Sequence, residues 1–459
     1  MAPPRSSSGY CISTTCPGCG GILRLEANFL TTRCAHCGSA VRIKPSTAPP
    51  AFVLKPRVER LQVRFFLDRY LKQAGRTLSS TPPEITGVYF PYWRVEAMLL
   101  RLRNRIEKRY DIPDWERGEE VVEREQRATE VSLSPYTLTL PADARAAAFP
   151  ASLGVRPQIA LLYPITADYL REDFAIWPIR LEAKSAFDHA RAAAGNLDRL
   201  SQTGIKRNQS HLFGGELSVI YMPYYLCRGK ESYLVDAISG EVSPADDLDL
   251  PEVDAASTEF GALEIELHRC TNCGYELPEN GSLIQVCAEC ESVVRLDAVA
   301  NLGKLPLGFP ERQSEGDSLF PFYMFDIAAA DAGRLQKALC GLKEIRQMVI
   351  PAFAMGNFEA LYRLASRMSS AGAQSEPIEL ADWPRQFAPV TVSIAEAQGI
   401  AAAVYARALT GKTDAIDSAS FNLAAERVRL LFAAFRADGY FFVDEYLGAI
   451  TFERAAIKP

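Results

Sequence analysis

The sequence predicts an α+β fold in which one unit, a small cysteine-rich β-domain followed by a mixed α+β domain, occurs twice. Eight of the eleven cysteines form two sets of paired CxxC motifs, one in each half of the chain. An aromatic segment of the same pattern follows each set, and a hairpin pattern closes each half. Features that recur in the same order predict an internal duplication.

The cysteine pairs have the spacing of metal sites. Fourteen residues separate the pairs of the first set, and thirteen separate those of the second. Four thiolates at this spacing form a closed tetrahedral site, which is the usual geometry of structural zinc. The sequence therefore predicts two zinc ribbons with one Zn²⁺ ion each. The predicted ligands are Cys16, Cys19, Cys34 and Cys37 in the first ribbon, and Cys270, Cys273, Cys287 and Cys290 in the second.

Iron is the alternative metal, because four thiolates also bind the iron of a rubredoxin-like electron-transfer centre. Rubredoxin-type proteins separate their CxxC pairs by more residues, so zinc is favoured. His36 and His268 lie beside the two clusters, but four thiolates already close each site, and neither histidine is predicted as a ligand. Cys11 is either a spare ligand or a small residue on a strand, and the second interpretation is favoured.

Composition restricts the class of protein. The chain of 459 residues is too long for one ordinary domain, and its composition is that of a soluble globular protein. No apolar run reaches roughly 18 residues, the length of a membrane span. The first residues also lack the apolar stretch of a signal peptide, so we expect a cytoplasmic protein with reduced cysteines. A net charge of −6 argues against binding nucleic acid over the whole surface.

The two ribbons carry opposite charge. Residues 1–57 contain seven cations and one carboxylate, whereas residues 264–298 contain seven carboxylates and two cations. Two such surfaces do not share one anionic partner, but they can bind different partners or each other. We interpret the divergence as favouring different neighbours for the two ribbons.

The first half begins with a Pro/Ser-rich segment, residues 1–10, which is predicted to be disordered. Apolar residues at helical spacing then predict a helix after the ribbon. The predicted order is ribbon 1 at 11–44 and α+β domain A at 57–243, with a helix at 57–74, strands at 85–110 and within 131–182, a helix at 184–200 and a closing hairpin.

An acidic linker, residues 244–263, separates the halves. Ser393 and Glu396 form a capping box, which predicts the start of the last helix. The predicted order is ribbon 2 at 264–298 and α+β domain B at 299–459, with a strand at 318–327, a helix at 330–346, a strand at 348–355, helices at 357–369 and 393–409, and a closing hairpin.

The aromatic segments support the duplication. The first reads Phe-Pro-Tyr-Trp-Arg-Val-Glu from Phe90, and the second reads Phe-Pro-Phe-Tyr-Met-Phe-Asp from Phe320. If domain B is a diverged repeat of domain A, then Pro91 and Pro321 occupy equivalent positions. The ordinary role of alternating aromatics in a strand is core packing. The alternative is a partner or base-stacking surface made of Tyr92, Trp93, Phe322 and Tyr323.

These motifs carry a resemblance. CPxCG…CxxCG, followed by Val-Tyr-Phe-Pro-Tyr-Trp and a hairpin ending in Asp-x-x-x-Gly-x-Val, resembles a poorly characterised prokaryotic tandem zinc-ribbon family whose members are often loosely called helicase-related. The resemblance is best over residues 14–243, and it implies a fold arrangement without an established activity. One departure is Glu291, which follows Cys290 where the motif has glycine. A GxxxxGK[ST] motif is absent, so no helicase motor is predicted.

No catalytic motif accompanies the ribbons, since the chain has four histidines, no HExxH and no G-x-S-x-G, and we do not expect an enzyme. We expect a zinc-ribbon adaptor or assembly subunit that docks other proteins. The alternative is a nucleic-acid-binding adaptor that uses basic ribbon 1 and the strand face of Arg101, Arg103 and Arg105. Alternating arginines are also typical of a solvated strand face. Electron transfer by iron is the second alternative.

Overall fold

The computed structural model is a mixed α+β protein, as the sequence predicts. No helix among the described residues is long and apolar enough to cross a membrane. Residues 1–10 and most of the acidic linker lie outside the described part of the chain. The structure describes residues 11–26, 31–44, 48–77, 82–110, 123–144, 148–154, 157, 160–200, 205–245, 263–296, 307–309, 318–339, 345–371, 376–378, 387–409, 423–444 and 450–457.

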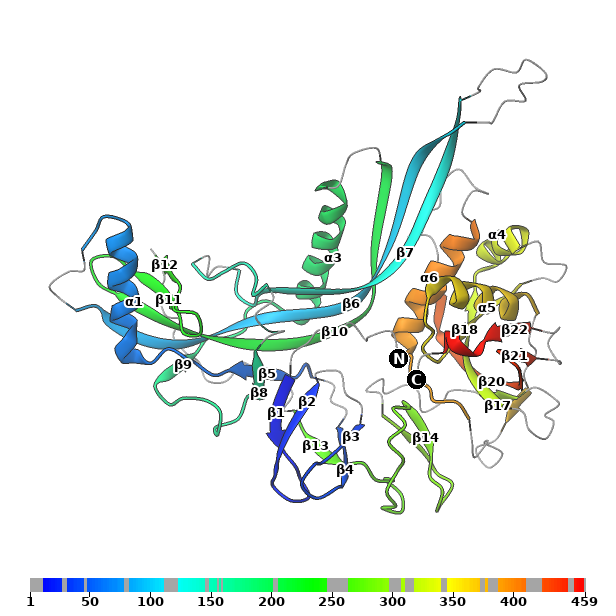
Figure 1. The fold of residues 1–459 in the computed structure, drawn as a ribbon, viewed down its shortest axis with the longest axis horizontal. Coiled ribbons are helices and arrows are strands. Elements are labelled where there is room, and N and C mark those ends of the chain that lie inside the picture. The colour runs from blue at the N-terminus through cyan, green and yellow to red at the C-terminus, as the bar shows by residue number, and fades with distance from the viewer. Residues whose placement is uncertain are drawn as a thin grey trace.

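In the described part of the first half, a ten-stranded sheet is built around two long antiparallel strands, β6 (Glu84–Tyr110) and β10 (Ile205–Arg228). β6 also pairs with β7 (Glu123–Pro141), and the three strands form an arm that reaches toward the second half (Figure 1). The remaining order is β12 (Val242–Pro244), β11 (Tyr233–Asp236), β10, β5 (Ala51–Leu54), β8 (Leu161–Pro164), β1 (Cys11–Thr15) and β2 (Ile22–Glu26), with β9 (Phe174–Ile176) beside β6.

Strand β6 divides its side chains between two cores. Tyr89 and Trp93 lie in a core with helices α1 (Arg60–Gln73) and α3 (Ala183–Leu200). Phe90 and Tyr92, on the opposite face, lie in a core that includes Cys16 of ribbon 1. Burial on both faces explains why this strand begins as a nearly continuous apolar and aromatic run. Ribbon 1 is part of the large sheet because its strands β1 and β2 form one end of that sheet.

The described residues of the second half form a seven-stranded sheet and three α-helices, α4 (Ala329–Leu339), α5 (Phe358–Ala371) and α6 (Ile394–Leu409). The predicted helix at 330–346 corresponds to α4, which ends at Leu339. Residues 340–344 lie outside the described part of the chain, and residues 345 and 346 are not helical. The strand order is β18 (Gln347–Pro351), β17 (Ser318–Ile327), β20 (Leu423–Asp438), β16 (Leu307–Phe309) and β19 (Glu376–Ile378), with β21 (Phe441–Asp444) and β22 (Ile450–Glu453) continuing from β20.

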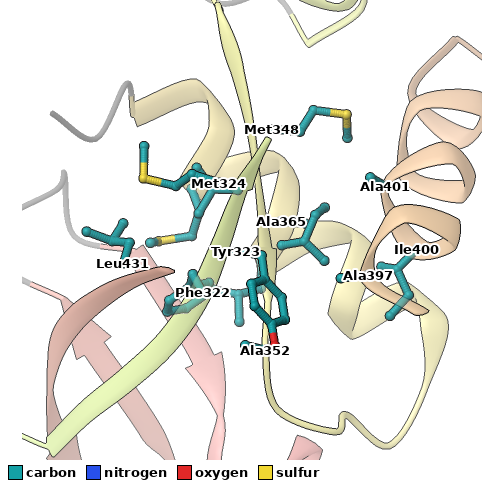
Figure 2. Packing of buried hydrophobic residues seen from close by; sticks show 14 of the residues in the cluster. Phe322, Tyr323, Met324, Met348, Ala352, Ala365, Ala397, Ile400, Ala401 and Leu431 are labelled. Atoms are coloured by element: carbon teal, nitrogen blue, oxygen red, sulfur yellow. The ribbon is translucent and has the colours of Figure 1, made fainter. Parts of the chain in front are cut away.

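The core of this half lies between β17 and the helices. Figure 2 shows that side chains of β17 lie in one core cluster with Ala365 of α5 and with Ala397 and Ile400 of α6. The predicted capping box begins α6, since Glu396 N–H donates to Ser393 Oγ at 3.2 Å and Ser393 N–H donates to the Glu396 carboxylate at 2.8 Å. The small residues of α6 allow close packing on both of its faces.

The two halves repeat one set of strand pairings. In the first half β10 pairs with β6 antiparallel and with β5 parallel, and it continues into β11. In the second half β20 pairs with β17 antiparallel and with β16 parallel, and it continues into β21. Pro91 of β6 lies opposite Tyr221 of β10, and Pro321 of β17 lies opposite Phe432 of β20. The prolines therefore occupy the same place in corresponding strands.

Hydrogen bonds around these prolines also repeat. Pro91 O accepts a bond from Ala142 N at 3.0 Å, and Ala142 O accepts one from Leu181 N at 2.8 Å, just before α3. Trp93, two residues after the proline, donates from its indole N–H to Leu181 O at 2.7 Å.

The second half has the corresponding bonds in the same order. Pro321 O accepts from Ala352 N at 2.9 Å, and Ala352 O accepts from Val392 N at 3.1 Å, just before α6. Tyr323, two residues after the proline, donates its hydroxyl to Val392 O at 2.9 Å. This correspondence supports the interpretation of domain B as a diverged repeat of domain A.

Helix α6 joins the two halves. Ala402, Ala403 and Ala406 form a small core with Leu100 and Leu102 of the arm. A Cβ atom added at Gly399 would lie 2.7 Å from the Cβ of Phe213, so glycine permits the helix to contact the arm closely. The junction depends on small side chains on α6 and large ones on the strands.

Candidate metal centres

The first cysteine cluster is assembled by two similar turns. Cys16 Sγ lies 3.8 Å from Cys37 Sγ, and Cys19 Sγ lies 3.8 Å from Cys34 Sγ. The four sulfurs lie within 4.8 Å of one another. Each turn is closed by a backbone bond from the glycine that follows a pair, Gly20 N to Cys16 O and Gly38 N to Cys34 O. Both glycines have positive φ, a conformation that glycine adopts without the steric cost of a side chain.

The second cluster has the same construction. Cys270 Sγ lies 3.6 Å from Cys290 Sγ, and Cys273 Sγ lies 3.6 Å from Cys287 Sγ. Glu291, which departs from the glycine motif, adopts φ 58° and donates its N–H to Cys287 O at 2.9 Å. The last turn of ribbon 2 therefore forms in the same way as the glycine turns, with a side chain in the left-handed region.

The thiols of each cluster are suited to a cation. Hydrogen bonds from the side chain and the N–H of Ser39 lower the pKa of Cys37 to about 6. The Gly21 N–H lowers the pKa of Cys19, but the adjacent Cys37 sulfur and burial raise it, to about 12. In ribbon 2 the pKa of Cys290 is lowered to about 5, mainly by the hydroxyl of Ser292.

Without a cation, the thiols whose pKa is lowered ionise first, and their charge then opposes ionisation of the neighbouring thiols. A divalent ion removes this opposition, because it binds all four sulfurs as thiolates. The donor set and its geometry therefore fit Zn²⁺, and the fold is consistent with two zinc ribbons.

Neither cluster includes Cys11, Cys227 or His268. Cys11 lies on β1, is partly buried, and is not among the four sulfurs of the first cluster. Cys227 is fully buried on β10, and this burial raises the pKa of its thiol to about 12. His268 is buried and its Nε2–H donates to Pro278 O at 3.2 Å, which gives it a structural role beside ribbon 2.

The two ribbons contact each other directly. Strand β13 (Ile265–Leu267), which leads into ribbon 2, pairs antiparallel with β4 (Ala40–Ile43), which leaves ribbon 1. With β3 (Thr31–Arg33) they form a three-stranded sheet. The strand pairing ends with Lys44 N donating to Glu264 O at 2.9 Å and His268 N donating to Ala40 O at 2.8 Å. A strand of one ribbon thus completes the sheet of the other.

Opposite charges meet along this added strand. Arg42 Nε lies 2.6 Å from a Glu266 carboxylate oxygen, and only 6% of the Arg42 side chain is exposed. Lys44 pairs with Glu264 at 2.5 Å. Arg33 pairs with Glu279 of ribbon 2 at 2.7 Å. The ribbons are therefore each other's neighbours, and the interpretation that favoured different neighbours is wrong.

These ion pairs differ in how much they stabilise the contact between the two ribbons. The Lys44 and Glu264 side chains are 53% and 57% exposed, so water and salt screen their attraction and the pair contributes little to stability. Arg42 is almost wholly buried, and removing its carboxylate partner would leave a charge with little access to water. The pair of Arg42 with Glu266 therefore dominates the electrostatic part of the interface.

The predicted nucleic-acid face is not an open basic surface. Arg101 and Arg103 of β6 are only partly exposed, and Arg103 lies directly across from Glu130 of β7. Arg105 continues the strand, but its side chain lies outside the described residues. Three of the cations of ribbon 1 are engaged by carboxylates of ribbon 2. None of these observations favours nucleic acid.

The aromatic residues proposed as an alternative binding surface belong to the core. Tyr92 and Trp93 are 0% and 4% exposed, and Phe322 and Tyr323 are both 0% exposed. The surface interpretation of these four residues is wrong, because each half covers both faces of its aromatic strand. Their packing leaves none of these four rings accessible to a partner.

The metal sites predicted from the sequence did not include strand β13, which joins them. Its signal was present, since Glu264 and Glu266 alternate before Cys270 just as Arg42 and Lys44 alternate after Cys37. Alternating charges of opposite sign on two short segments are what cross-strand pairing requires.

The comparisons with known proteins leave the two centres to be interpreted from their geometry. No protein-family model, no curated protein and no solved structure matches this chain. The structure therefore defines a protein with two four-cysteine sites of the zinc-binding kind, joined by a shared sheet.

Proposed function

We propose that this protein is a non-catalytic adaptor or assembly subunit, in which zinc holds two ribbons as one rigid docking unit. The observation that carries the proposal is the strand β13, which connects the two four-cysteine clusters through a common sheet. A ribbon of about 30 residues has too little core to fold alone, so metal supplies much of its stability. Because the two ribbons share a sheet, they form a surface that is already ordered before a partner binds.

Ribbon 1 offers the docking edge. β2 is the last strand of its sheet, and β3 belongs to the other sheet, so within the described residues neither pairs with the other. Between them lies a groove of about 400 Å³. Ile22, 65% exposed, and the exposed Arg24 and His36 line it. An unpaired edge beside such a groove fits the addition of an extended segment from another protein.

Metal analysis is the first test. Purified protein is expected to contain two zinc ions per chain and to lack visible absorption. A coloured, reducible protein would instead support the rubredoxin-like iron centre and contradict the zinc proposal.

Partner capture from the native host is the second test. We expect specific partners to copurify with the wild-type chain and to be lost from Ile22→Glu and Arg24→Glu, two substitutions at exposed positions. Tyr275→Ser, an exposed aromatic on ribbon 2, is the matched control. A chain that remains a partner-free monomer, or partners indifferent to both groove substitutions, would contradict the docking role.

A further inference from the structure

Helix α1 exposes two large apolar side chains on its outward face. Leu61 is 93% exposed and Phe65 is 63% exposed. Because they are four residues apart, they lie on the same face of the helix. That face is opposite the buried residues Val63, Leu67 and Leu71. Adjacent exposed apolar groups of this size mark an interaction surface.

Cations surround this pair. Residues 57–72 contain five arginines and lysines and two carboxylates, in a chain whose net charge is −6. Both carboxylates are paired, Glu59 with Arg171 and Asp68 with Lys72. The Arg69 guanidinium lies over the Phe65 ring, 5.8 Å from its centre. The outward face of α1 is therefore apolar at Leu61 and Phe65, with exposed arginines beside them and the Asp68–Lys72 ion pair about one turn further along.

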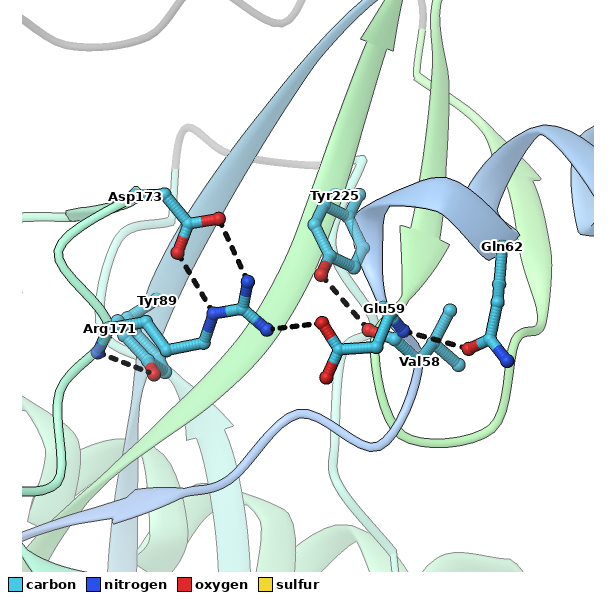
Figure 3. Close-up of polar contacts among 7 residues, drawn as sticks. All are labelled: Val58, Glu59, Gln62, Tyr89, Arg171, Asp173 and Tyr225. Atoms are coloured by element: carbon cyan, nitrogen blue, oxygen red, sulfur yellow. Dashed lines mark hydrogen bonds and ion pairs between the residues drawn. The ribbon is translucent and has the colours of Figure 1, made fainter.

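The helix is held firmly from its inner side. Figure 3 shows the Tyr225 hydroxyl donating to Val58 O, Glu59 N–H donating to the Gln62 side chain, and Arg171 bridging Glu59 and Asp173. The bonds to Val58 and Gln62 are both 2.9 Å. These contacts fix the start of α1 and its orientation before any partner binds.

The inner face adds a close contact. The Phe66 ring packs on Gly240, where an added Cβ would come within 2.3 Å of a ring carbon. Since α1 is already fixed on one side, Leu61 and the outer part of Phe65 are left exposed in the described part of the chain, although the Phe65 ring meets the Phe66 ring edge-on with 5.6 Å between their centres. They are presented on a rigid support.

The exposed apolar side chains and arginines of α1 together indicate which class of partner fits this face. Nucleic acid would use the arginines and stack on Phe65, but it gives no role to an aliphatic side chain as exposed as Leu61. A protein groove that binds a helix uses a row of apolar anchors, and here the next position of that row is Asp68. A membrane surface accepts two apolar side chains at the acyl boundary while arginines remain with the phosphates.

We propose that α1 is a peripheral attachment site for an anionic membrane surface. Leu61 and Phe65 insert at the boundary of headgroups and acyl chains. Arg60, Arg64 and Arg69 contact lipid phosphates. This inference does not depend on the metal centres or on the docking groove of ribbon 1.

Vesicle cosedimentation of the full zinc-loaded chain tests the proposal. We expect binding to phosphatidylcholine vesicles that contain about 30% phosphatidylglycerol, weak binding to phosphatidylcholine alone, and a decrease as salt is added. Leu61→Ser with Phe65→Ser should lower the partition coefficient at least about tenfold. Arg64→Glu with Arg69→Glu should abolish the preference for anionic vesicles.

Tyr440→Ser is the matched control, since Tyr440 is 86% exposed on a hairpin of the other half. It should bind vesicles like the wild type. Thermal unfolding and zinc content show whether each variant is folded, and the exposed positions predict that all are. Three results would overturn the proposal: no binding to anionic vesicles, binding unchanged by Leu61→Ser with Phe65→Ser, or a gel shift with nucleic acid that requires Arg64 and Arg69 in place of vesicle binding.

Discussion

Cysteines of this chain differ in what their replacement removes. Cys290 is one of four sulfurs in ribbon 2, whereas Cys11 lies outside both clusters. Cys290→Ser is expected to reduce bound zinc from two ions per chain to one, because three thiolates no longer close the site. Cys11→Ser should retain both ions. Metal analysis after gel filtration checks this, and retention of two ions by Cys290→Ser would contradict the assignment of ribbon 2.

Glu291 has a backbone conformation that glycine adopts more easily. Its φ of 58° is left-handed, like that of Gly274 at 77° in the same ribbon. Glu291→Gly is expected to stabilise ribbon 2 by about 0.5–1 kcal/mol, and Gly274→Ala to destabilise it by a similar amount. Zinc loss to a chelator measures both. Faster loss from Glu291→Gly would show that the glutamate side chain has a role beyond the turn.

Asp173 links stability to pH. Hydrogen bonds from Arg171 hold its pKa below the ordinary value, so the folded chain binds this proton less readily than the unfolded chain. The stabilisation is complete above a pH of about 4 and is lost as pH falls through the lowered pKa. Asp173→Asn should therefore flatten the acid limb of unfolding free energy against pH. An acid limb as steep in Asp173→Asn as in the wild type would contradict this link between Asp173 and stability.

The element on which the ribbons depend is the short strand β13. Arg42→Glu places a second carboxylate against Glu266 in a nearly buried position. We expect this substitution to lower the free energy of unfolding by about 2–4 kcal/mol. Glu266→Arg should be destabilising as well, and the double exchange should recover part of the loss. Chelator resistance of both ribbons is the measurement. If the double variant is no better than the singles, charge complementarity is not what joins the ribbons.

Individual elements were predictable where one local pattern decided them. Helices α1 and α3 and strand β17 follow from apolar spacing, and the capping box at Ser393 correctly begins α6. The turns of both cysteine clusters also follow from local spacing. Strand β13 has three residues and pairs with a segment more than two hundred residues away, so its alternating carboxylates identify it only when they are compared with the alternating cations Arg42 and Lys44. The outward position of Leu61 and Phe65 likewise depends on which face of α1 the sheet covers.

The whole molecule depends on the fit of α6 against the arm. Gly399→Val adds side-chain volume where a Cβ would already lie 2.7 Å from Phe213. We expect a loss of about 1–3 kcal/mol at this junction, seen as faster proteolysis between the halves. Gly195→Ala in α3 is the control, because nothing lies within 4 Å of its added Cβ. Equal proteolysis of the two variants would mean that α6 does not hold the halves together.

For the whole molecule, the sequence indicates that the unit is duplicated but does not indicate how the two halves contact each other. The motif around Pro91 and Pro321 predicts that two similar units exist, and the repeated hydrogen bonds support it. The contact between the units depends on small residues of α6 whose pattern is that of any buried helix. Opposite charge on the ribbons left two arrangements open, and only the pairing of β4 with β13 distinguishes them.

The same pairing has a consequence for synthesis of the chain. The side chains of Arg42 and Glu266 are separated by 224 residues, and a ribosome adds about 5–20 residues per second. For on the order of ten seconds or more, nascent ribbon 1 presents the free edge of β4 to other chains. Arg42 and Lys44 stand along that edge, and charged residues on an edge discourage pairing with foreign strands. We therefore expect these two cations to disfavour pairing of the β4 edge with foreign strands until ribbon 2 has been synthesised.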